Sequence, residues 1–262
     1  MALIEFASVG KSYLSQSGRV AAAVRDFTMS LEEGEFFCLL GPSGCGKTTV
    51  LAMLAGFESP TEGRIVLDGV AIERPSRDRG VVFQGDSSLY PWLTAIENVE
   101  FGLRLGGMAA AERRRMAEEY LRLVGLRGQQ DKYPGELSGG MKQRIQIARA
   151  LANRPKMLLM DEPFGALDAQ TRGVMQRELR QIWRSSKLSV FFITHDIDEA
   201  LVLGTRIGIM TAGPGGTLKE VVPVDLNEGR SRTDARYSLL YERIHASIRE
   251  EVERTTVLQE DS

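Results

Sequence analysis

A glycine-rich segment with one lysine and two threonines is the clearest sign of chemistry in this sequence. It consists of Gly41, Pro42, Ser43, Gly44, Cys45, Gly46, Lys47, Thr48 and Thr49. An apolar run precedes it and a helix-like run follows, so the segment is predicted to join a buried strand to a helix. Its N–H groups and the helix dipole would then hold a polyphosphate, with Lys47 at the β- and γ-phosphates and the Thr48 hydroxyl on Mg²⁺. A glycine-rich turn with an incidental lysine is the alternative, which the spacing and flanks disfavour.

Two adjacent carboxylates follow a second apolar run. Asp161 and Glu162 come directly after residues 157–160. An unpaired buried charge is strongly disfavoured, so two carboxylates at the end of a buried strand need a task. We expect Asp161 to support Mg²⁺ together with Thr48, and Glu162 to orient and deprotonate water. The alternative is an acidic surface turn, which the upstream phosphate loop disfavours.

A histidine also follows a buried apolar run. His195 follows the apolar run 190–193 and is one of two histidines in the chain. Ligands of parallel sheets gather at the carboxyl ends of the strands, so we expect His195 near a bound nucleotide. The other histidine, His245, falls in an amphipathic C-terminal helix and is predicted to be a surface residue.

Three further positions have both a functional and a structural interpretation. Ser138, followed by Gly139 and Gly140, is a good N-cap whose helix start exposes N–H groups to an anion, although alone it is only a capped helix. Tyr13 is able to stack on a base, but periodicity favours a half-buried strand tyrosine. For Trp92, an exposed docking surface and a core position are evenly balanced.

The surrounding elements alternate between strands and helices. Residues 2–40 contain four short predicted strands, at 3–9, 20–24, 27–31 and 36–40. A helical block is predicted from 95 to about 152, and its charged part at 109–124 has the mixed signs of a solvated helix face. The remaining predicted elements are strands at 63–69, 80–84, 157–160, 190–193 and within 206–224, and helices at 171–185 and 235–253.

Composition excludes several classes of protein. The chain has 262 residues, with 33 Lys and Arg against 35 Asp and Glu, so it lacks the basic excess typical of nucleic-acid binders. Cys38 and Cys45 fall on a buried strand and in the phosphate loop, so a reducing compartment fits and no disulfide is expected. No apolar run approaches the roughly 20 residues of a membrane helix. The N-terminal residues lack the pattern of a signal peptide, so none is expected. Any membrane role is expected to go through a partner.

These motifs, in this order, resemble the ATP-binding subunits of ABC transporters over about residues 3–225. The resemblance implies an α/β P-loop NTPase (ABC ATPase) core with an N-terminal antiparallel β subdomain and an inserted α-helical subdomain. It implies an ABC ATPase domain at 1–230, with the helical subdomain at about 86–155, and a C-terminal helical tail at 231–262. In such proteins two copies pack head to tail, so that each ATP lies between the phosphate loop of one copy and the signature motif of the other.

The resemblance also implies roles for individual residues. Tyr13 would stack on adenine, Gln84 would be the Q-loop glutamine that couples the site to the membrane partner, and His195 would hold the γ-phosphate and the attacking water. The implied catalytic residues are Glu162, His195 and Lys47, and the implied Mg²⁺ ligands are Thr48, Gln84 and Asp161. The other implied ATP contacts are residues 41–49, the signature residues Ser138, Gly139 and Gly140, and Asp168 of the D-loop.

A finer resemblance is to the importer subunits of the nitrate, sulfonate and taurine group. It rests on residues 78–84, 91–94, 98–103 and 160–168, with a departure at 88–90 in the expected contact region with the membrane subunit. It implies ATP and Mg²⁺ as cofactors, a peripheral location on the cytoplasmic face of the cell membrane, and no nucleic-acid partner. The implied partners are a second copy or close homologue, a transmembrane permease and, indirectly, a solute-binding protein.

Two other functions are set against this interpretation. Soluble ABC ATPases of translation usually carry two cassettes, and those of DNA repair carry a long coiled-coil insertion, neither of which is in this sequence. A nucleotide-binding module without hydrolysis is disfavoured because Lys47, Asp161, Glu162 and His195 are all present. The sequence therefore predicts an ATPase that drives the import of a small solute.

Overall fold

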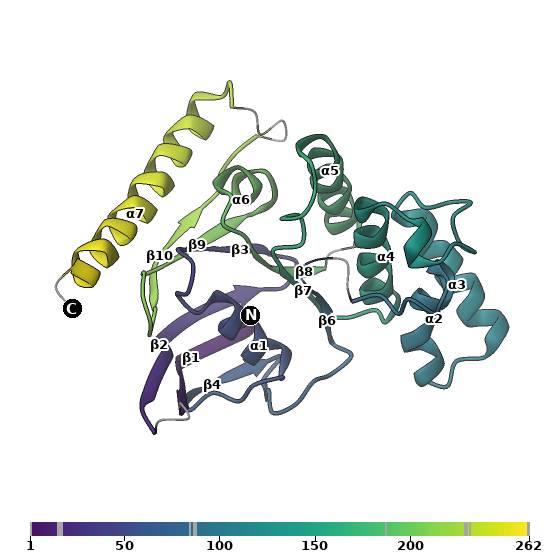
Figure 1. The fold of residues 1–262 in the computed structure, drawn as a ribbon, viewed down its shortest axis with the longest axis horizontal. Coiled ribbons are helices and arrows are strands. Elements are labelled where there is room, and N and C mark those ends of the chain that lie inside the picture. Colours follow the sequence, from purple (N-terminus) through teal and green to yellow (C-terminus); the bar gives the residue numbers. More distant parts are fainter. Residues whose placement is uncertain are drawn as a thin grey trace. The chain divides into compact units, whose positions relative to one another are not determined.

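The computed structural model describes residues 2–14, 18–83, 85, 88–186, 188–227, 230 and 232–260. The chain forms two compact units, whose residues can be followed in Figure 1 by the colours of the sequence bar. The first unit combines Met1–Ser76 with Ser189–Ser262, and the second unit is Arg77–Leu188. The second unit is therefore an insertion in the sequence of the first. The domain boundaries expected from the sequence, at 86, 155 and 230, stay a prediction.

An antiparallel sheet forms one part of the first unit. Its strands are β1 (Ala2–Leu14), β2 (Val20–Glu32), β4 (Glu62–Leu67) and β5 (Val70–Ala71), in the order β2-β1-β4-β5. The prediction of two strands at 20–24 and 27–31 is wrong, because β2 runs through both. Val9 pairs with Phe27 and Lys11 with Val24, so β2 has one residue more than β1 in this interval. Asp26 takes a left-handed backbone there (φ 40°), and the strand continues through this bulge.

Parallel strands form the buried centre of the first unit. They are β3 (Phe36–Leu40), β8 (Ser189–Ile193) and β9 (Arg206–Met210), and β3 pairs in parallel with both of the others. The antiparallel strand β10 (Leu218–Pro223) pairs with β9. All residues of β3 and β8 are buried, which explains why the sequence shows them as continuous apolar runs. The helices of this unit are α1 (Lys47–Ala55), α6 (Ile197–Leu203) and α7 (Ala235–Glu260).

Helices dominate the second unit (Figure 1). Its strands β6 (Arg79–Val82) and β7 (Met157–Asp161) pair in parallel. Between them the chain forms the helices α2 (Ala95–Leu105) and α3 (Ala110–Leu123), the short 3₁₀ helix η1 (Pro134–Glu136) and α4 (Gly139–Ala152). Helix α5 (Ala169–Ser186) follows β7. Helix α2 starts at a capping box, in which Thr94 and Glu97 each accept a hydrogen bond from the other's backbone N–H.

Several local predictions are confirmed. Both cysteines are free and buried, and His245 is exposed on α7.

Helix α7 is longer than the predicted 235–253, since it runs to Glu260. None of the described helices combines the length and the apolar character needed to cross a membrane.

Candidate functional site

The glycine-rich segment joins β3 to α1, as its flanks predict. Gly46 is the N-cap of α1 and has a left-handed backbone (φ 99°, ψ 9°). A Cβ at this position would lie only 2.5 Å from the carbonyl oxygen of Ala23 on β2. Only glycine therefore lets the start of α1 come this close to the antiparallel sheet.

Lys47 lies in the middle of this loop. Its Nζ donates to the carbonyl oxygens of Gly41 and Pro42, at 2.8 Å each, and the residue is 8% exposed. Ser43, Gly44 and Thr48 are exposed around it. An ammonium group is thus held at the N-terminus of a helix, beside an exposed hydroxyl, and both features favour an anion.

Strand pairing brings His195 to the same edge as this loop. Leu39 of β3 is the parallel partner of Ile193 of β8, and the Thr194 N–H donates to the Leu39 carbonyl at 3.3 Å. The loop and His195 therefore follow the carboxyl ends of two adjacent parallel strands, which is where ligands of such sheets bind. His195 is exposed.

Tyr13 lies on β1 opposite Ala21 of β2, two residues along β2 from the Ala23 that meets Gly46. Tyr13 is 41% exposed, so the structure favours the exposed alternative over the half-buried tyrosine. The Nζ of Lys11 lies 5.1 Å from the centre of its ring. This lysine also forms an ion pair with Glu58 at 2.7 Å.

A glycine outside the motif also shapes the loop. A Cβ at Gly216 would lie 2.3 Å from the carbonyl oxygen of Cys45, so Gly216 packs directly on the loop. In the sequence this residue is only part of a glycine-rich turn at 213–216. Nothing in the sequence pattern indicates this contact, because Cys45 and Gly216 are 216 − 45 = 171 positions apart in the chain.

The two carboxylates lie in the second unit. Asp161 is the last residue of β7, and Glu162 has a left-handed backbone (φ 42°), which is uncommon for a non-glycine residue. Such strained conformations concentrate at functional sites. Val82 of β6 and Met160 of β7 are parallel partners, so the segment after β6 starts beside Asp161. Gln84, the predicted Q-loop residue of that segment, lies outside the described residues.

Two helix starts come together in the second unit. The Ser138 Oγ accepts a hydrogen bond from the Met141 N–H, which confirms Ser138 as the N-cap of α4. A Cβ at Gly140 would lie 2.7 Å from the side chain of Thr171 on α5. Asp168 caps α5, because its Oδ1 accepts from the N–H groups of Gln170 and Thr171 at 3.0 Å each. These bonds, first of all the one from Thr171, lower the pKa of the Asp168 carboxyl.

The predicted site residues thus form two sets. The first unit carries Tyr13, residues 41–49 and His195, and the second unit carries Ser138, Gly139, Gly140, Asp161, Glu162 and Asp168. Within the described parts of the chain, no three His, Cys, Asp or Glu side chains gather as a metal site. Mg²⁺ does not need such a cage, because it keeps several waters and binds through one or two protein ligands plus phosphate oxygens. The Thr48 hydroxyl and the Asp161 carboxylate are hard oxygen donors that fit this ion.

An aromatic cluster on the second unit combines exposed Trp92 with half-buried Tyr90 and Phe101. Trp92 is 70% exposed, which decides between the two interpretations of this residue in favour of a surface position. The ring of Tyr90 lies between those of Trp92 and Phe101, with centroid distances of 5.5 and 4.5 Å. Asn98, which is fully buried, fixes the loop beneath by hydrogen bonds to the backbone of residues 90–94.

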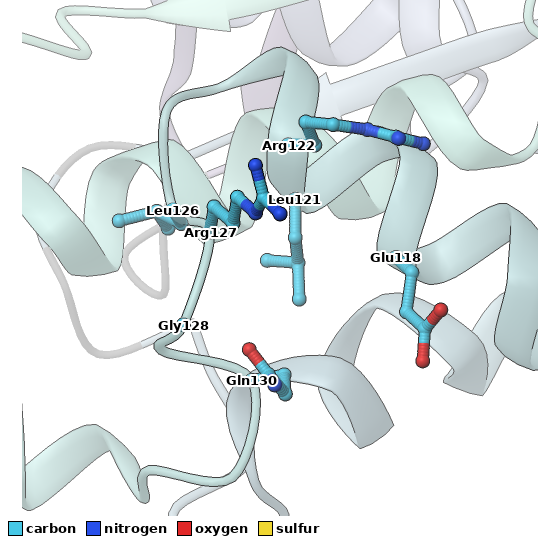
Figure 2. Close-up of a pocket in the computed structure, with 7 residues that line it drawn as sticks. All are labelled: Glu118, Leu121, Arg122, Leu126, Arg127, Gly128 and Gln130. Atoms are coloured by element: carbon cyan, nitrogen blue, oxygen red, sulfur yellow. The ribbon is translucent and has the colours of Figure 1, made fainter.

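A separate pocket of about 360 Å³ lies near the end of α3. Figure 2 shows Leu121, Arg127 and Gln130 around this open space. None of the predicted site residues lines it. The pocket is therefore separate from both sets of predicted site residues.

Comparison with known proteins shows the family. The family model described as "ABC transporter" matches residues 24–165. The nitrate import ATP-binding protein NrtD of Synechococcus elongatus is 44% identical and is aligned over 90% of this chain and 88% of its own length. The bicarbonate transport ATP-binding protein CmpD of Synechocystis is 46% identical over 88% and 82%. The taurine import ATP-binding protein TauB of Pseudomonas aeruginosa is 49% identical over 80% and 79%.

A solved structure agrees with this result. It is a dimeric ATP-binding cassette in a post-hydrolysis state, bound to ADP and Pi. Its TM-score to this chain is 0.75 at 33% sequence identity, and the match covers 86% of this chain and all of the other. The fold predicted from the sequence, an ABC ATPase core, is confirmed. The chain belongs to the ABC transporter family, and within it to the ATP-binding subunits.

Proposed function

We propose that this chain is the ATP-hydrolysing subunit of an importer of a small anionic or organic solute. Two copies, or one copy and a close homologue, close over two Mg·ATP and reopen after hydrolysis. The observation that carries this proposal is the register of β3 and β8, which sets the phosphate loop and His195 side by side at one sheet edge. The second set of residues would supply the rest, namely a second helix N-terminus at Ser138 and a general base at Glu162.

Each bound ATP would contact two copies. Lys47 and the N–H groups of the loop bind the β- and γ-phosphates, and Tyr13 stacks on the adenine. Ser138, Gly139 and Gly140 of the other copy present a second helix N-terminus to the same phosphates, and Asp168 lies beside it. This division explains why one chain carries two helix starts suited to anions on two different units.

Hydrolysis needs a base, an orienting group and a cation. Glu162 accepts the proton of the attacking water, and His195 holds that water and the γ-phosphate in line. Thr48, Asp161 and Gln84 would hold Mg²⁺, which neutralises charge on the transferred phosphoryl group when bound.

The membrane partner would dock on the aromatic cluster of Tyr90, Trp92 and Phe101. A tryptophan that is 70% exposed and held on a hydrogen-bonded loop is the kind of anchor that dominates protein interfaces. The relatives named for nitrate, bicarbonate and taurine import support a small anion or zwitterion as solute. The location would be the cytoplasmic face of the membrane, with a solute-binding protein on the other side.

Glu162→Gln tests the catalytic assignment. The variant should bind ATP with unchanged affinity while turnover falls by a factor of about 10² to 10⁴, the usual contribution of a general base. Glu119→Gln is the matched control, because Glu119 is exposed on α3 and lies outside both sets. Undiminished hydrolysis by Glu162→Gln would remove Glu162 from the mechanism.

Purification from membranes tests the transport role. Under mild detergent, the chain should co-purify with a permease that has several membrane spans, and Trp92→Ala should reduce the yield of that complex without changing ATP affinity. Association with ribosomes or DNA instead would refute import and support a soluble ABC ATPase.

A further inference from the structure

The C-terminal segment, which runs from Arg230 through helix α7, holds helix α6, which follows His195. Helix α6 begins only two residues after His195, and Asp196 is its N-cap, accepting from the N–H groups of Asp198 and Glu199 at 2.8 and 3.2 Å. Thr194, on the other side of His195, donates to Glu199 at 2.7 Å and accepts from the Asp196 N–H at 3.0 Å. The backbone on both sides of His195 is thus tied to the first turn of α6.

Asp198 in that first turn is held by two side chains from the C-terminal segment. The Tyr237 hydroxyl donates to Asp198 Oδ1 at 2.6 Å, and Arg232 donates to both carboxylate oxygens. Tyr237 is 2% exposed and Arg232 is largely exposed, so Tyr237 is the better fixed of the two. Burial and then the hydrogen bond to Asp198 raise the pKa of the Tyr237 hydroxyl, which therefore stays protonated and keeps donating.

The other end of α6 is held by the same segment. Arg230 donates to the carbonyl oxygens of Leu201 and Val202, at 2.8 and 3.2 Å, and to that of Gly204. The carbonyls of Leu201 and Val202 belong to the last turn of the helix and have no partner within it, and Gly204 is its C-cap. Both ends of α6 are therefore bound to residues 230–237.

Helix α7 anchors this segment to the sheet. Lys219 on β10 pairs with Glu251 of α7 at 2.8 Å, and Glu251 is 3% exposed. Glu220 accepts from the Ser247 hydroxyl at 2.6 Å and from Arg243 at 2.7 Å. Since β10 pairs with β9, and β9 with β3, the anchor belongs to the same sheet that carries the phosphate loop.

We propose that Tyr237, through Asp198 and α6, is a positioning residue for His195, so that the C-terminal segment sets the rate of ATP hydrolysis. This inference rests on the proposed function, because it requires His195 to act on the γ-phosphate. Tyr237 touches no reacting atom. It limits the range of positions of α6, and with it the range of positions of His195 relative to the loop.

Tyr237→Phe tests the proposal by steady-state ATPase kinetics. Misplacement of a reacting group by about 1 Å can cost up to about 100-fold in rate, and we expect a decrease of about 10-fold in kcat because Arg232 still holds Asp198. The KM for ATP should stay within about two-fold, since the phosphate loop is not altered. Tyr241→Phe is the matched control, one turn further along α7, where the ring stacks on His245, and its kcat should equal that of the wild type.

A double variant separates positioning from general stabilisation. In a His195→Ala background, Tyr237→Phe should cause no further loss of kcat, because its effect passes through His195. If it lowers kcat by the same factor in both backgrounds, the positioning role is overturned. Asp198→Asn keeps the acceptor for Tyr237 and loses the charge that faces Arg232, so it should lower kcat less than Tyr237→Phe. If Tyr237→Phe does not fold, Asp198→Leu takes its place in the same double-variant test.

The outcomes also separate this inference from the proposed function. If His195→Ala leaves turnover intact, the role of His195 in the proposed function is wrong. If His195→Ala lowers turnover while Tyr237→Phe leaves kcat at the wild-type value, the proposed function stands and the positioning role of Tyr237 is refuted.

Discussion

Replacing Asn98 by alanine should loosen the loop that carries Trp92. Asn98 is fully buried at the start of α2, and its Oδ1 accepts from the Tyr90 N–H at 2.9 Å. Its Nδ2 lies 3.0 to 3.1 Å from the carbonyl oxygens of Tyr90, Leu93 and Thr94. One side chain therefore bonds one N–H and three carbonyl oxygens of residues 90–94, in addition to the turn bond from the Leu93 N–H to the Tyr90 carbonyl.

The expected loss follows from the number of these bonds. The amide has two N–H hydrogens and one acceptor in use, which makes three hydrogen bonds of about 1 kcal/mol each, or about 3 kcal/mol in total. For a domain of this size, 1 kcal/mol shifts the Tm by about 2–4 °C, so Asn98→Ala should lower the Tm by about 6–12 °C. Asn153→Ala is the matched control, because Asn153 Nδ2 makes one such bond, to Arg149 at 3.1 Å. It should lower the Tm by about 2–4 °C.

Hydrogen exchange adds a local measurement to the melting curve. The Tyr90 amide should lose its protection in Asn98→Ala and keep it in Asn153→Ala, since only the former removes its acceptor. Asn98→Asp gives a sharper contrast, because it buries a carboxylate against three carbonyl oxygens. That carboxyl would have a raised pKa, so the variant should be less stable than Asn98→Ala at pH 7 and regain stability as the pH falls and the group is protonated.

Equal Tm losses for Asn98→Ala and Asn153→Ala would refute this account of the loop. So would retained protection of the Tyr90 amide in Asn98→Ala. In either case the position of Trp92 would depend on packing among the aromatic rings instead of on the buried amide.

Two further predictions concern the first unit. Gly46→Ala should abolish ATP binding and lower the Tm strongly, because the new Cβ would overlap the Ala23 carbonyl. Gly44 also has a positive φ but faces open space, so Gly44→Ala should lower the free energy of unfolding by only about 1–3 kcal/mol. Similar Tm values for the two variants would contradict the steric explanation. The hydrogen bond from Ser247, and then Arg243, lowers the pKa of Glu220, so its contribution to stability is present above the carboxyl's ordinary value near 4.5 and is lost as the pH falls through the lowered value. Thermal melts of Glu220→Gln should therefore differ from wild type at pH 7 and converge with it in acid, and a difference that is constant with pH would count against this linkage.

The local structure around each motif was predictable because each motif is contiguous in the sequence. A buried apolar run, the glycine pattern and the Lys47–Thr48 pair together specify strand, loop and helix start, and β3 has the predicted bounds 36–40. The cap at Ser138 was predictable for the same reason, since it depends only on the next three residues. The motifs therefore carry most of the information about single elements.

Contacts between distant parts of the chain were not predictable. The bulge at Asp26 depends on the pairing of β1 with β2, so periodicity within residues 20–32 could not show that one strand runs through them. Gly216 on Cys45 and Tyr237 on Asp198 are tertiary contacts of residues that look ordinary in the sequence. The exposure of Trp92 was open because an aromatic residue in an irregular segment has no periodic pattern to place it.

The two carbonyl contacts of Lys47 have a consequence for how nucleotide arrives. With its Nζ held 2.8 Å from the oxygens of Gly41 and Pro42, this side chain has already lost its rotational freedom when the protein folds. In the proposed function, phosphate binding would therefore exchange the hydrogen-bond partners of a lysine that is already ordered, and would not have to order a mobile side chain. The conformational entropy of this lysine is thus lost when the protein folds and not when nucleotide binds.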